Sequence, residues 1–253
     1  MKLIFRIALL ATFGCSQQPA HATAAVFDAD AWRVVTAPKA DSDSAQCINR
    51  APNSWMVALS PHSDSVRIVP ADSPRYAHAL RVAGGTLTSV SRGEFGGEIA
   101  FKPDNSPSVR ISGLNLLEFL PTRKEIYGLA AWPTLGGDEG QLVRFEREPS
   151  GGWKIVSLLE LGREAVAYTV LPNDTILVVT YDGAMLVHPP TFHRDLHRNT
   201  LWSMTIPTSV VRDKTGVIFI GMRMGVARLT PDGNQYREEW LMPTRCGRQC
   251  CGA

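Results

Sequence analysis

The sequence predicts an all-β protein built from copies of one four-strand unit of about 43 residues. Strands of similar outline begin at four glycines, and the separations between them are 42 or 43 residues. These glycines are Gly97, Gly140, Gly183 and Gly225. An apolar or β-branched run precedes each glycine strand, and turn-forming residues follow it. Four short antiparallel strands at this period are typical of a β-propeller blade.

The best-preserved copy runs from Val210 to Gly233 and predicts three short strands in a meander. Its turns are Asp213 to Gly216, Gly221 to Gly225 and Pro231 to Gly233, and its apolar strands are Val217 to Ile220 and Val226 to Leu229. One such unit cannot bury its own faces, so neighbouring copies must cover them. Within this copy, Met222, Arg223 and Met224 are the candidates for contact with a ligand.

Five copies predict a single propeller domain of five blades over residues 25–243. The first copy is Trp55 to Leu59 followed by Pro61, which lacks the glycine. Residues 25–50 are expected to supply the first strands of the first blade, or a strand that closes the ring beside the last blade. Six blades are the alternative, in which residues 25–50 form most of a blade. Helical repeats need long amphipathic segments, which Pro, Gly and β-branched residues interrupt here.

The copy around Asp213 carries the pattern Asp-x-x-Gly-x-x-aromatic-Ile-Gly, followed by Gly-Val-x-Arg-Leu ending at Leu229. This pattern resembles the propeller repeats in the sensor domains of two-component regulators. The resemblance implies a fold rather than an activity. Sensor proteins of that family also carry many more repeats, a transmembrane helix and a kinase module, which this sequence does not include.

The first 24 residues predict a secretory signal peptide. Lys2 and Arg6 precede the apolar run Ile7 to Phe13, and Ala-x-Ala cleavage sites end at Ala22 and Ala24. The run is shorter than the roughly 20 residues that span a bilayer, so we expect no membrane span. The protein is therefore expected in the periplasm or outside the cell.

Cys15 offers an alternative ending for this signal. It follows the small residue Gly14, as the lipidated cysteine of a bacterial lipoprotein does. Thr12 and Phe13 depart from the usual lipoprotein pattern. A lipid anchor through Cys15 would make the protein an outer-membrane lipoprotein.

The charge of the mature chain is balanced. Lys2 and Arg6 leave with the signal, so basic and acidic residues stand at 24 each. A neutral chain gives no reason to expect nucleic acid or an anionic membrane surface as a partner.

Four further cysteines predict disulfides, which export permits. Cys47 lies in the first blade, whereas Cys246, Cys250 and Cys251 lie in a C-terminal tail of residues 244–253. The two ends are neighbours in a closed ring, so Cys47 is expected to pair with the tail, most simply with Cys246 or Cys250. The alternatives are a metal or redox site in the tail, a disordered tail and intermolecular pairing, but the cysteine spacing is not that of a zinc finger.

Three histidines lie close together in the sequence, at His188, His193 and His197. With Asp195 they could hold zinc or copper, yet Arg194 and Arg198 disfavour a cation site. We expect exposed histidines in an enlarged connection, and neither a metal nor another cofactor.

Ligands of propellers usually bind at one face of the ring. This face carries the loops between the second and third strands of each blade and the loops that lead from one blade into the first strand of the next. Aromatic and charged side chains in these loops could hold a small polar ligand, a sugar or a peptide. They are Arg92, Glu94, Trp132, Asp138, Tyr181, Asp182, Met222 and Arg223. The alternative is that turns are simply charged and that tryptophans, including Trp153, Trp202 and Trp240, pack between blades.

The sequence lacks the usual enzyme motifs. It has no Gly-x-Ser-x-Gly elbow, His-Glu-x-x-His helix, phosphate-binding loop or dinucleotide fingerprint. We therefore expect an exported, non-catalytic propeller that binds a small ligand or a protein partner. The alternatives are a propeller hydrolase or lyase acting on carbohydrate or peptide, and a purely structural role. Convergence of two or three carboxylates in the central channel would favour catalysis.

Overall fold

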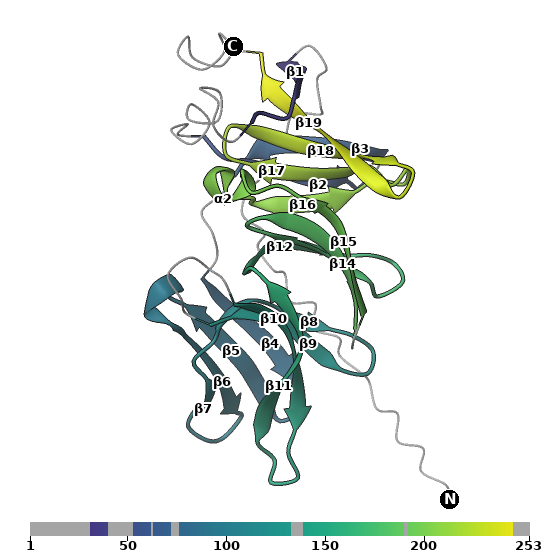
Figure 1. The fold of residues 1–253 in the computed structure, drawn as a ribbon. Helices are drawn as coiled ribbons and strands as arrows, with labels where there is room; N and C mark the ends of the chain where they lie inside the picture. Colours follow the sequence, from purple (N-terminus) through teal and green to yellow (C-terminus); the bar gives the residue numbers. More distant parts are fainter. Residues whose placement is uncertain are drawn as a thin grey trace, which may run out of the picture.

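A computed structural model describes residues 31–39, 53–61, 63–71, 76–132, 139–189 and 192–244, and strands dominate it (Figure 1). The first strands are β1 (Trp32–Thr36), β2 (Trp55–Ser60) and β3 (Ser63–Pro70). Next come β4 (Ala77–Val82), β5 (Gly85–Ser91), β6 (Gly97–Pro103), β7 (Val109–Ser112), β8 (Asn115–Pro121), β9 (Ile126–Ala131), β10 (Gly140–Arg147) and β11 (Trp153–Gly162). The remaining strands are β12 (Ala165–Val170), β13 (Ile176–Thr180), β14 (Gly183–His188), β15 (Phe192–Arg198), β16 (Ser209–Arg212), β17 (Ile218–Met222), β18 (Gly225–Asp232) and β19 (Gln235–Pro243). A short 3-10 helix, η2 (Gly93–Phe95), precedes β6, and one helical turn, α2 (Trp202–Thr205), precedes β16.

The strands form repeated antiparallel sheets. Three sheets have four strands each: β4 to β7, β8 to β11, and β12 to β15. The fourth sheet consists of β16 to β19, and β1 joins it as a fifth strand. β2 and β3 pair in a separate hairpin. The predicted glycine strands β6, β10, β14 and β18 are each the third strand of their sheet. The prediction of an all-β fold of repeated four-stranded antiparallel units is therefore confirmed.

The sheets stack in sequence order, each against the next, and the hairpin β2–β3 packs on the last sheet (Figure 1). The first strands β4, β8, β12 and β16 lie at sheet edges and contact one another in succession. Among the described residues, however, the five sheets form an open series: the hairpin and the sheet β4–β7 lie at opposite ends of it. The closed ring expected from the sequence is thus not formed, and the number of blades stays a prediction.

Strand β1 joins the last sheet, which is one of the two roles expected for residues 25–50. It pairs with β19 in a register that runs from Trp32 opposite Pro243 to Thr36 opposite Glu239. β1 therefore covers the outer edge of β19, which would otherwise present unpaired backbone groups. The hairpin is attached to the same sheet through its backbone: the Val57 amide donates to Ser209 Oγ at 2.8 Å, and Ser54 forms an isolated bridge with Arg223.

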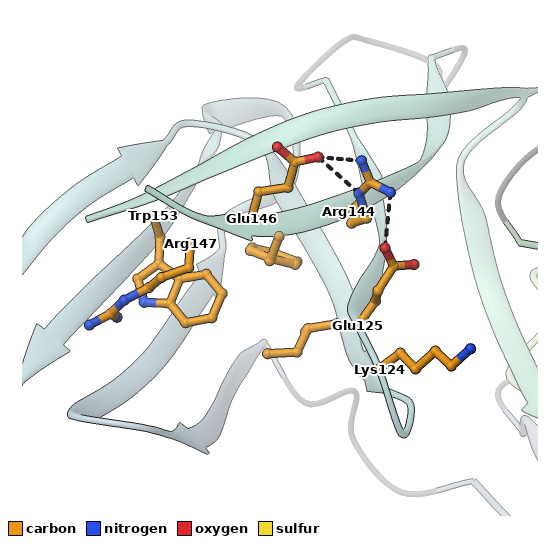
Figure 2. A pocket seen from close by; sticks show the side chains of 8 residues that line it. Lys124, Glu125, Arg144, Glu146, Arg147 and Trp153 are labelled. Carbon is orange, nitrogen blue, oxygen red and sulfur yellow. Dashed lines mark hydrogen bonds and ion pairs between the residues drawn. The ribbon is translucent and has the colours of Figure 1, made fainter. Parts of the chain in front are cut away.

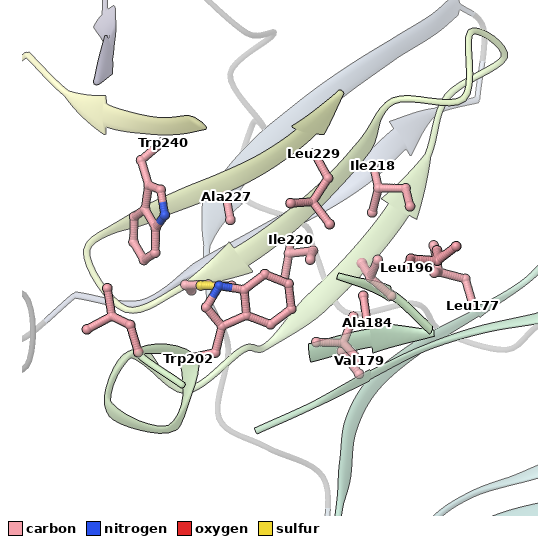
Figure 3. Close-up of a cluster of buried hydrophobic side chains, with 14 of the residues drawn as sticks. Leu177, Val179, Ala184, Leu196, Trp202, Ile218, Ile220, Ala227, Leu229 and Trp240 are labelled. Carbon is pink, nitrogen blue, oxygen red and sulfur yellow. The ribbon is translucent and has the colours of Figure 1, made fainter. Parts of the chain in front are cut away.

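The apolar cores lie between neighbouring sheets. In the largest, side chains of β13, β14 and β15 meet those of β17, β18 and β19 (Figure 3). Trp202 and Trp240 have no exposed surface, which confirms the packing role expected for these two tryptophans. Met222 and Met224 are also buried, so the suggestion that they contact a ligand is wrong, and both belong to the core.

A buried carboxylate closes one end of this core. Glu238 Oε1 accepts the indole N–H groups of Trp202 at 3.1 Å and Trp240 at 2.7 Å. Its Oε2 accepts Asn199 Nδ2 at 2.7 Å and lies 2.6 Å from His197 Nε2. Burial would raise the pKa of Glu238, but these four partners outweigh it and lower the pKa below its usual value. The four partners link β15, α2 and β19.

The predicted turn at Asp213 has the geometry that its residues favour. Asp213 Oδ1 accepts the backbone amides of Thr215 and Val217, both at 2.9 Å. Gly216 adopts a φ of +89°, a conformation that is costly for residues with a side chain. The aspartate and the glycine of this repeat are thus explained by the turn.

Gly140, the first residue of β10, permits close contact with the segment that joins β11 to β12. A methyl group on Gly140 would overlap the backbone carbonyl of Arg163, an atom that cannot swing away. Gly140→Ala is therefore expected to lower the free energy of unfolding by about 1 to 3 kcal/mol, measured by urea denaturation. In the control Gly113→Ala the new methyl group meets only the flexible end of Arg110, 2.8 Å away, so equal losses in the two variants would refute the explanation.

Several predictions fall outside the described residues. They are the signal of residues 1–24 with Cys15, the proposed disulfides of Cys47, Cys246, Cys250 and Cys251, and the loop residue Asp138. These stay predictions. In the part of the chain that is described, no helix is long and apolar enough to cross a membrane.

Candidate functional site

Polar side chains from three different sheets meet where the first strands contact one another. We call His78 on β4, Glu118 on β8 and Tyr168 on β12 the central polar group. His78 Nδ1 lies 3.2 Å from Glu118 Oε2, which links the first two of these sheets. The negative charge of Glu118 also raises the pKa of Tyr168, a residue of the third sheet. His78, Glu118 and Tyr168 thus come from the first strands of three successive sheets.

The local structure of β8 holds Glu118 in place. The pairing of β8 with β9 shifts between Leu116 and Glu118, so a bulge interrupts the strict alternation of side chains. Glu118 Oε1 also accepts the amide of Phe119 at 3.0 Å. The Glu118 side chain nevertheless keeps 31% of its surface exposed, whereas His78 keeps 12%. Glu118 is therefore fixed by its own strand and is still accessible.

Tyr168 is held in its neutral form. Burial and the charge of Glu118 together raise the pKa of its phenol to about 12. At neutral pH the hydroxyl therefore carries its proton and can donate a hydrogen bond. The central polar group then combines a carboxylate acceptor, an imidazole and a phenol donor.

A second set of side chains lies at the end of the sheets that carries the loops between second and third strands. Tyr181, in the turn between β13 and β14, interacts with Glu164 and Tyr76. Burial raises the pKa of both Tyr181 and Glu164, and the carboxyl of Glu164 forms no hydrogen bond or ion pair with any described residue. Tyr76 precedes His78 by two positions, so both lie on one side of the extended chain. We call Tyr76, Glu164 and Tyr181 the mouth; Tyr76 lies next to β4, the strand that carries His78.

Of the predicted binding residues in the described part of the chain, Arg92, Trp132, Tyr181, Asp182 and Arg223 lie between the second and third strands of their sheets. Tyr181 also belongs to the mouth. Asp182, beside it, accepts Thr180 Oγ1 at 2.9 Å and Arg198 Nη1 at 3.0 Å within its own sheet. Trp132 follows the last residue of β9 and is about half exposed.

Two predicted arginines occupy equivalent loops of other sheets. The Arg92 amide donates to Asn115 at 3.3 Å, and its guanidinium lies 3.7 Å from Glu98. The Arg223 amide donates to the Thr205 carbonyl at 2.7 Å. A ligand role for these residues, as for Trp132 and Asp182, stays a prediction.

The histidine-rich segment does not gather into one site. His188 Nδ1 lies 3.1 Å from Thr175 Oγ1, His197 contacts Glu238, and His193 is exposed on β15. Among the described residues, no group of three or more histidine, cysteine, aspartate and glutamate side chains is arranged to hold a metal ion.

No protein-family model matches the sequence, and no curated protein matches it significantly. Solved structures that this chain resembles in part include the extracellular domain of a putative hybrid two-component system from B. thetaiotaomicron, at 15% identity and a TM-score of 0.39. That match covers 76% of this chain, which spans only 26% of the sensor domain.

Two further structures are similar over most of this chain. A putative gluconolactonase shares 14% identity at a TM-score of 0.39, with 86% of this chain and 84% of that chain covered. Virginiamycin B lyase from Staphylococcus aureus shares 8% identity at a TM-score of 0.40, with 82% and 73% covered. The candidate site rests on the side chains of this chain alone.

His78, Glu118, Tyr168 and Glu164 were not singled out in the sequence. The positions of His78, Glu118 and Tyr168 do not follow the repeat period of about 43 residues. His78 is the second residue of β4, whereas Glu118 and Tyr168 are the fourth residues of β8 and β12. A signal did exist, since each is a polar side chain inside a short, mainly apolar strand that begins a repeat. Such residues are candidates for the axis along which the first strands of a propeller lie.

Proposed function

We propose that this protein is an exported, non-catalytic binding protein that holds a small polar ligand at the central polar group. The observation that carries the proposal is the contact of His78 with Glu118 across two sheets, at 3.2 Å. Strand β12 of a third sheet packs against β8, and its Tyr168 lies within the field of the Glu118 charge. Residues from separate repeats that converge on one accessible carboxylate are typical of a ligand site rather than of packing.

The chemistry of these side chains favours a neutral ligand rich in hydroxyl groups, such as a small sugar. Glu118 can accept hydrogen bonds from ligand hydroxyls, and the protonated Tyr168 can donate one. At the mouth, Tyr76 and Tyr181 supply aromatic faces that suit the apolar side of a sugar ring. An anionic ligand would be repelled by Glu118.

The number of carboxylates favours binding over catalysis. Within the described ranges, Glu118 is the carboxylate that interacts with His78 and with Tyr168, whereas Glu164 interacts with Tyr181 at the mouth. Glycoside hydrolysis needs two carboxylates at one point, and the described contacts of the central polar group include one, Glu118, which supports binding.

The test uses the exported form of the protein and a thermal-shift screen of mono- and disaccharides, with hits measured by calorimetry. Glu118→Gln and Tyr168→Phe are each expected to weaken the best hit about tenfold, or about 1.4 kcal/mol. Glu98→Gln, a carboxylate on β6 paired with Arg92, is the matched control and should bind normally. Loss of binding in the control, or unchanged binding in both site variants, would contradict the proposal.

A hydrolase or lyase acting on carbohydrate or peptide is the second candidate, and one observation favours it. Glu118 contacts Nδ1 of His78, and a carboxylate in that place orients the imidazole so that Nε2 can accept a proton. Proton NMR of each hit incubated with the protein distinguishes the two functions. Conversion that His78→Gln abolishes would establish catalysis, whereas unchanged spectra of a bound ligand support binding alone.

A further inference from the structure

Strand pairing in the sheet β12–β15 brings two residues of the mouth, Glu164 and Tyr181, beside each other. Ala165, the first residue of β12, pairs with Thr180, the last residue of β13. Glu164 directly precedes Ala165 and Tyr181 directly follows Thr180, so the two residues extend neighbouring strands at the same end of the sheet. The charge of Glu164 accordingly acts on the phenol of Tyr181.

Tyr76 occupies the place in the sheet β4–β7 that Glu164 occupies in its own sheet. It directly precedes β4, and its carbonyl accepts the amide of Ser91, the last residue of β5, at 2.7 Å. Tyr76 and Glu164 thus each lie one residue before a first strand, at the end where the second strand finishes. Both of these first strands contact β8, and Tyr76 interacts electrostatically with Tyr181.

Exposed aromatic side chains gather at this end of the sheets. Tyr76 keeps 59% of its surface exposed, Phe95 keeps 82% and Trp132 keeps 52%. Phe95 and Trp132 lie between the second and third strands of their sheets, as Tyr181 does. Aromatic faces that solvent can reach are suited to contact a cationic ligand.

Glu164 supplies a negative charge that no described residue compensates. It differs in this respect from the carboxylates of a cavity of about 450 Å³ at the opposite end of the sheet β8–β11, where Glu125 and Glu146 both contact Arg144 (Figure 2). Burial raises the pKa of Glu164, and no hydrogen bond or ion pair with a described residue offsets this effect. A cation that entered the mouth would provide the missing partner.

We infer that the mouth binds a small organic ammonium ion. Its positive charge would pair with Glu164, and its methyl or methylene groups would lie against the rings of Tyr76 and Tyr181. Glu164 would repel an anion, and a neutral molecule of the same shape would leave the carboxylate uncompensated. The inference goes beyond the proposed function, because it concerns a charged ligand at the mouth and does not require a ligand at the central polar group.

The test uses choline as the probe and the exported form of the protein. Its neutral isostere 3,3-dimethylbutanol, in which carbon replaces the ammonium nitrogen, is the comparison. In calorimetric titrations choline is expected to bind at least about tenfold more tightly than the isostere. Proton NMR should show the choline methyl signal shifted upfield by the tyrosine rings. Raising the salt from low to physiological concentration should weaken choline binding, because the charge pair is screened.

Glu164→Gln keeps the size of the side chain and removes its charge, so it is expected to weaken choline binding about tenfold. Tyr76→Ala removes one exposed ring and should weaken binding about threefold. The matched control is Glu98→Gln, which removes one negative charge near the same end of the sheet β4–β7, where Arg92 lies 3.7 Å from the carboxylate. It should bind choline as the unmodified protein does.

Equal binding of the isostere, no binding of choline, or an equal loss in Glu98→Gln would overturn the inference. Glu118→Gln should leave choline binding unchanged, so the mouth and the central polar group can fail separately.

Discussion

Replacing Glu238 with alanine is expected to lower the free energy of unfolding by about 3 to 5 kcal/mol. The substitution leaves the indole N–H groups of Trp202 and Trp240 buried without an acceptor, and it removes the partner of His197 and Asn199. Urea denaturation followed by tryptophan fluorescence measures the loss. Glu160→Ala, an exposed carboxylate on β11, is the control and should change stability by less than about 0.5 kcal/mol.

The same carboxylate predicts a dependence of stability on pH. Because the folded protein lowers the pKa of Glu238 below 4.5, its contribution is complete above that pH and is lost as the pH falls through the lowered pKa. Glu238→Gln should therefore show a shallower loss of stability in acid than the unmodified protein. Parallel acid profiles of the two proteins would contradict this account of Glu238.

Replacing Trp202 with alanine is expected to cost about 3 to 5 kcal/mol as well, for a different reason. The indole of Trp202 is fully buried between the sheets β12–β15 and β16–β19, so the substitution leaves a cavity in the largest core (Figure 3). Trp202→Phe keeps most of the packing and removes only the N–H donated to Glu238, and it should cost about 1 to 2 kcal/mol.

A double-mutant cycle separates the two effects. Trp202→Phe and Glu238→Ala remove the same hydrogen bond, so their combined cost should be smaller than the sum of the two separate costs. Exposed Trp132 supplies the control, since Trp132→Phe is expected to be nearly neutral. Strict additivity would mean that the bond between the indole and the carboxylate contributes nothing.

Local sequence patterns predicted the repeating part of this fold well. The apolar runs expected before the glycine strands at Gly140 and Gly183 form β9 (Ile126–Ala131) and β13 (Ile176–Thr180). Glycines such as Gly97 begin the third strands because the backbone of another segment packs against them. These features depend on turn chemistry and on strand alternation, which short stretches of sequence carry.

Features that depend on distant pairing were harder to predict. Glu238 lies in β19, the last strand of its repeat, yet its partners come from segments up to 41 positions away. His78 and Glu118 meet only because two sheets pack together and a bulge turns the β8 side chain. The open arrangement of the sheets likewise depends on contacts between repeats, which the repeat period does not encode.

The pairing of β1 with β19 has a consequence for the order in which this protein folds. Thr244 donates to the carbonyl of Ala31, 213 positions away, so the last sheet cannot be completed until nearly the whole chain is present. Such distant closure slows folding, because the entropy of a long loop is lost before the contacts form. If the chain crosses a membrane from its N-terminus, β1 cannot pair with β19 until the C-terminal strand has also crossed. The protein would then reach its final stability only when translocation is nearly complete.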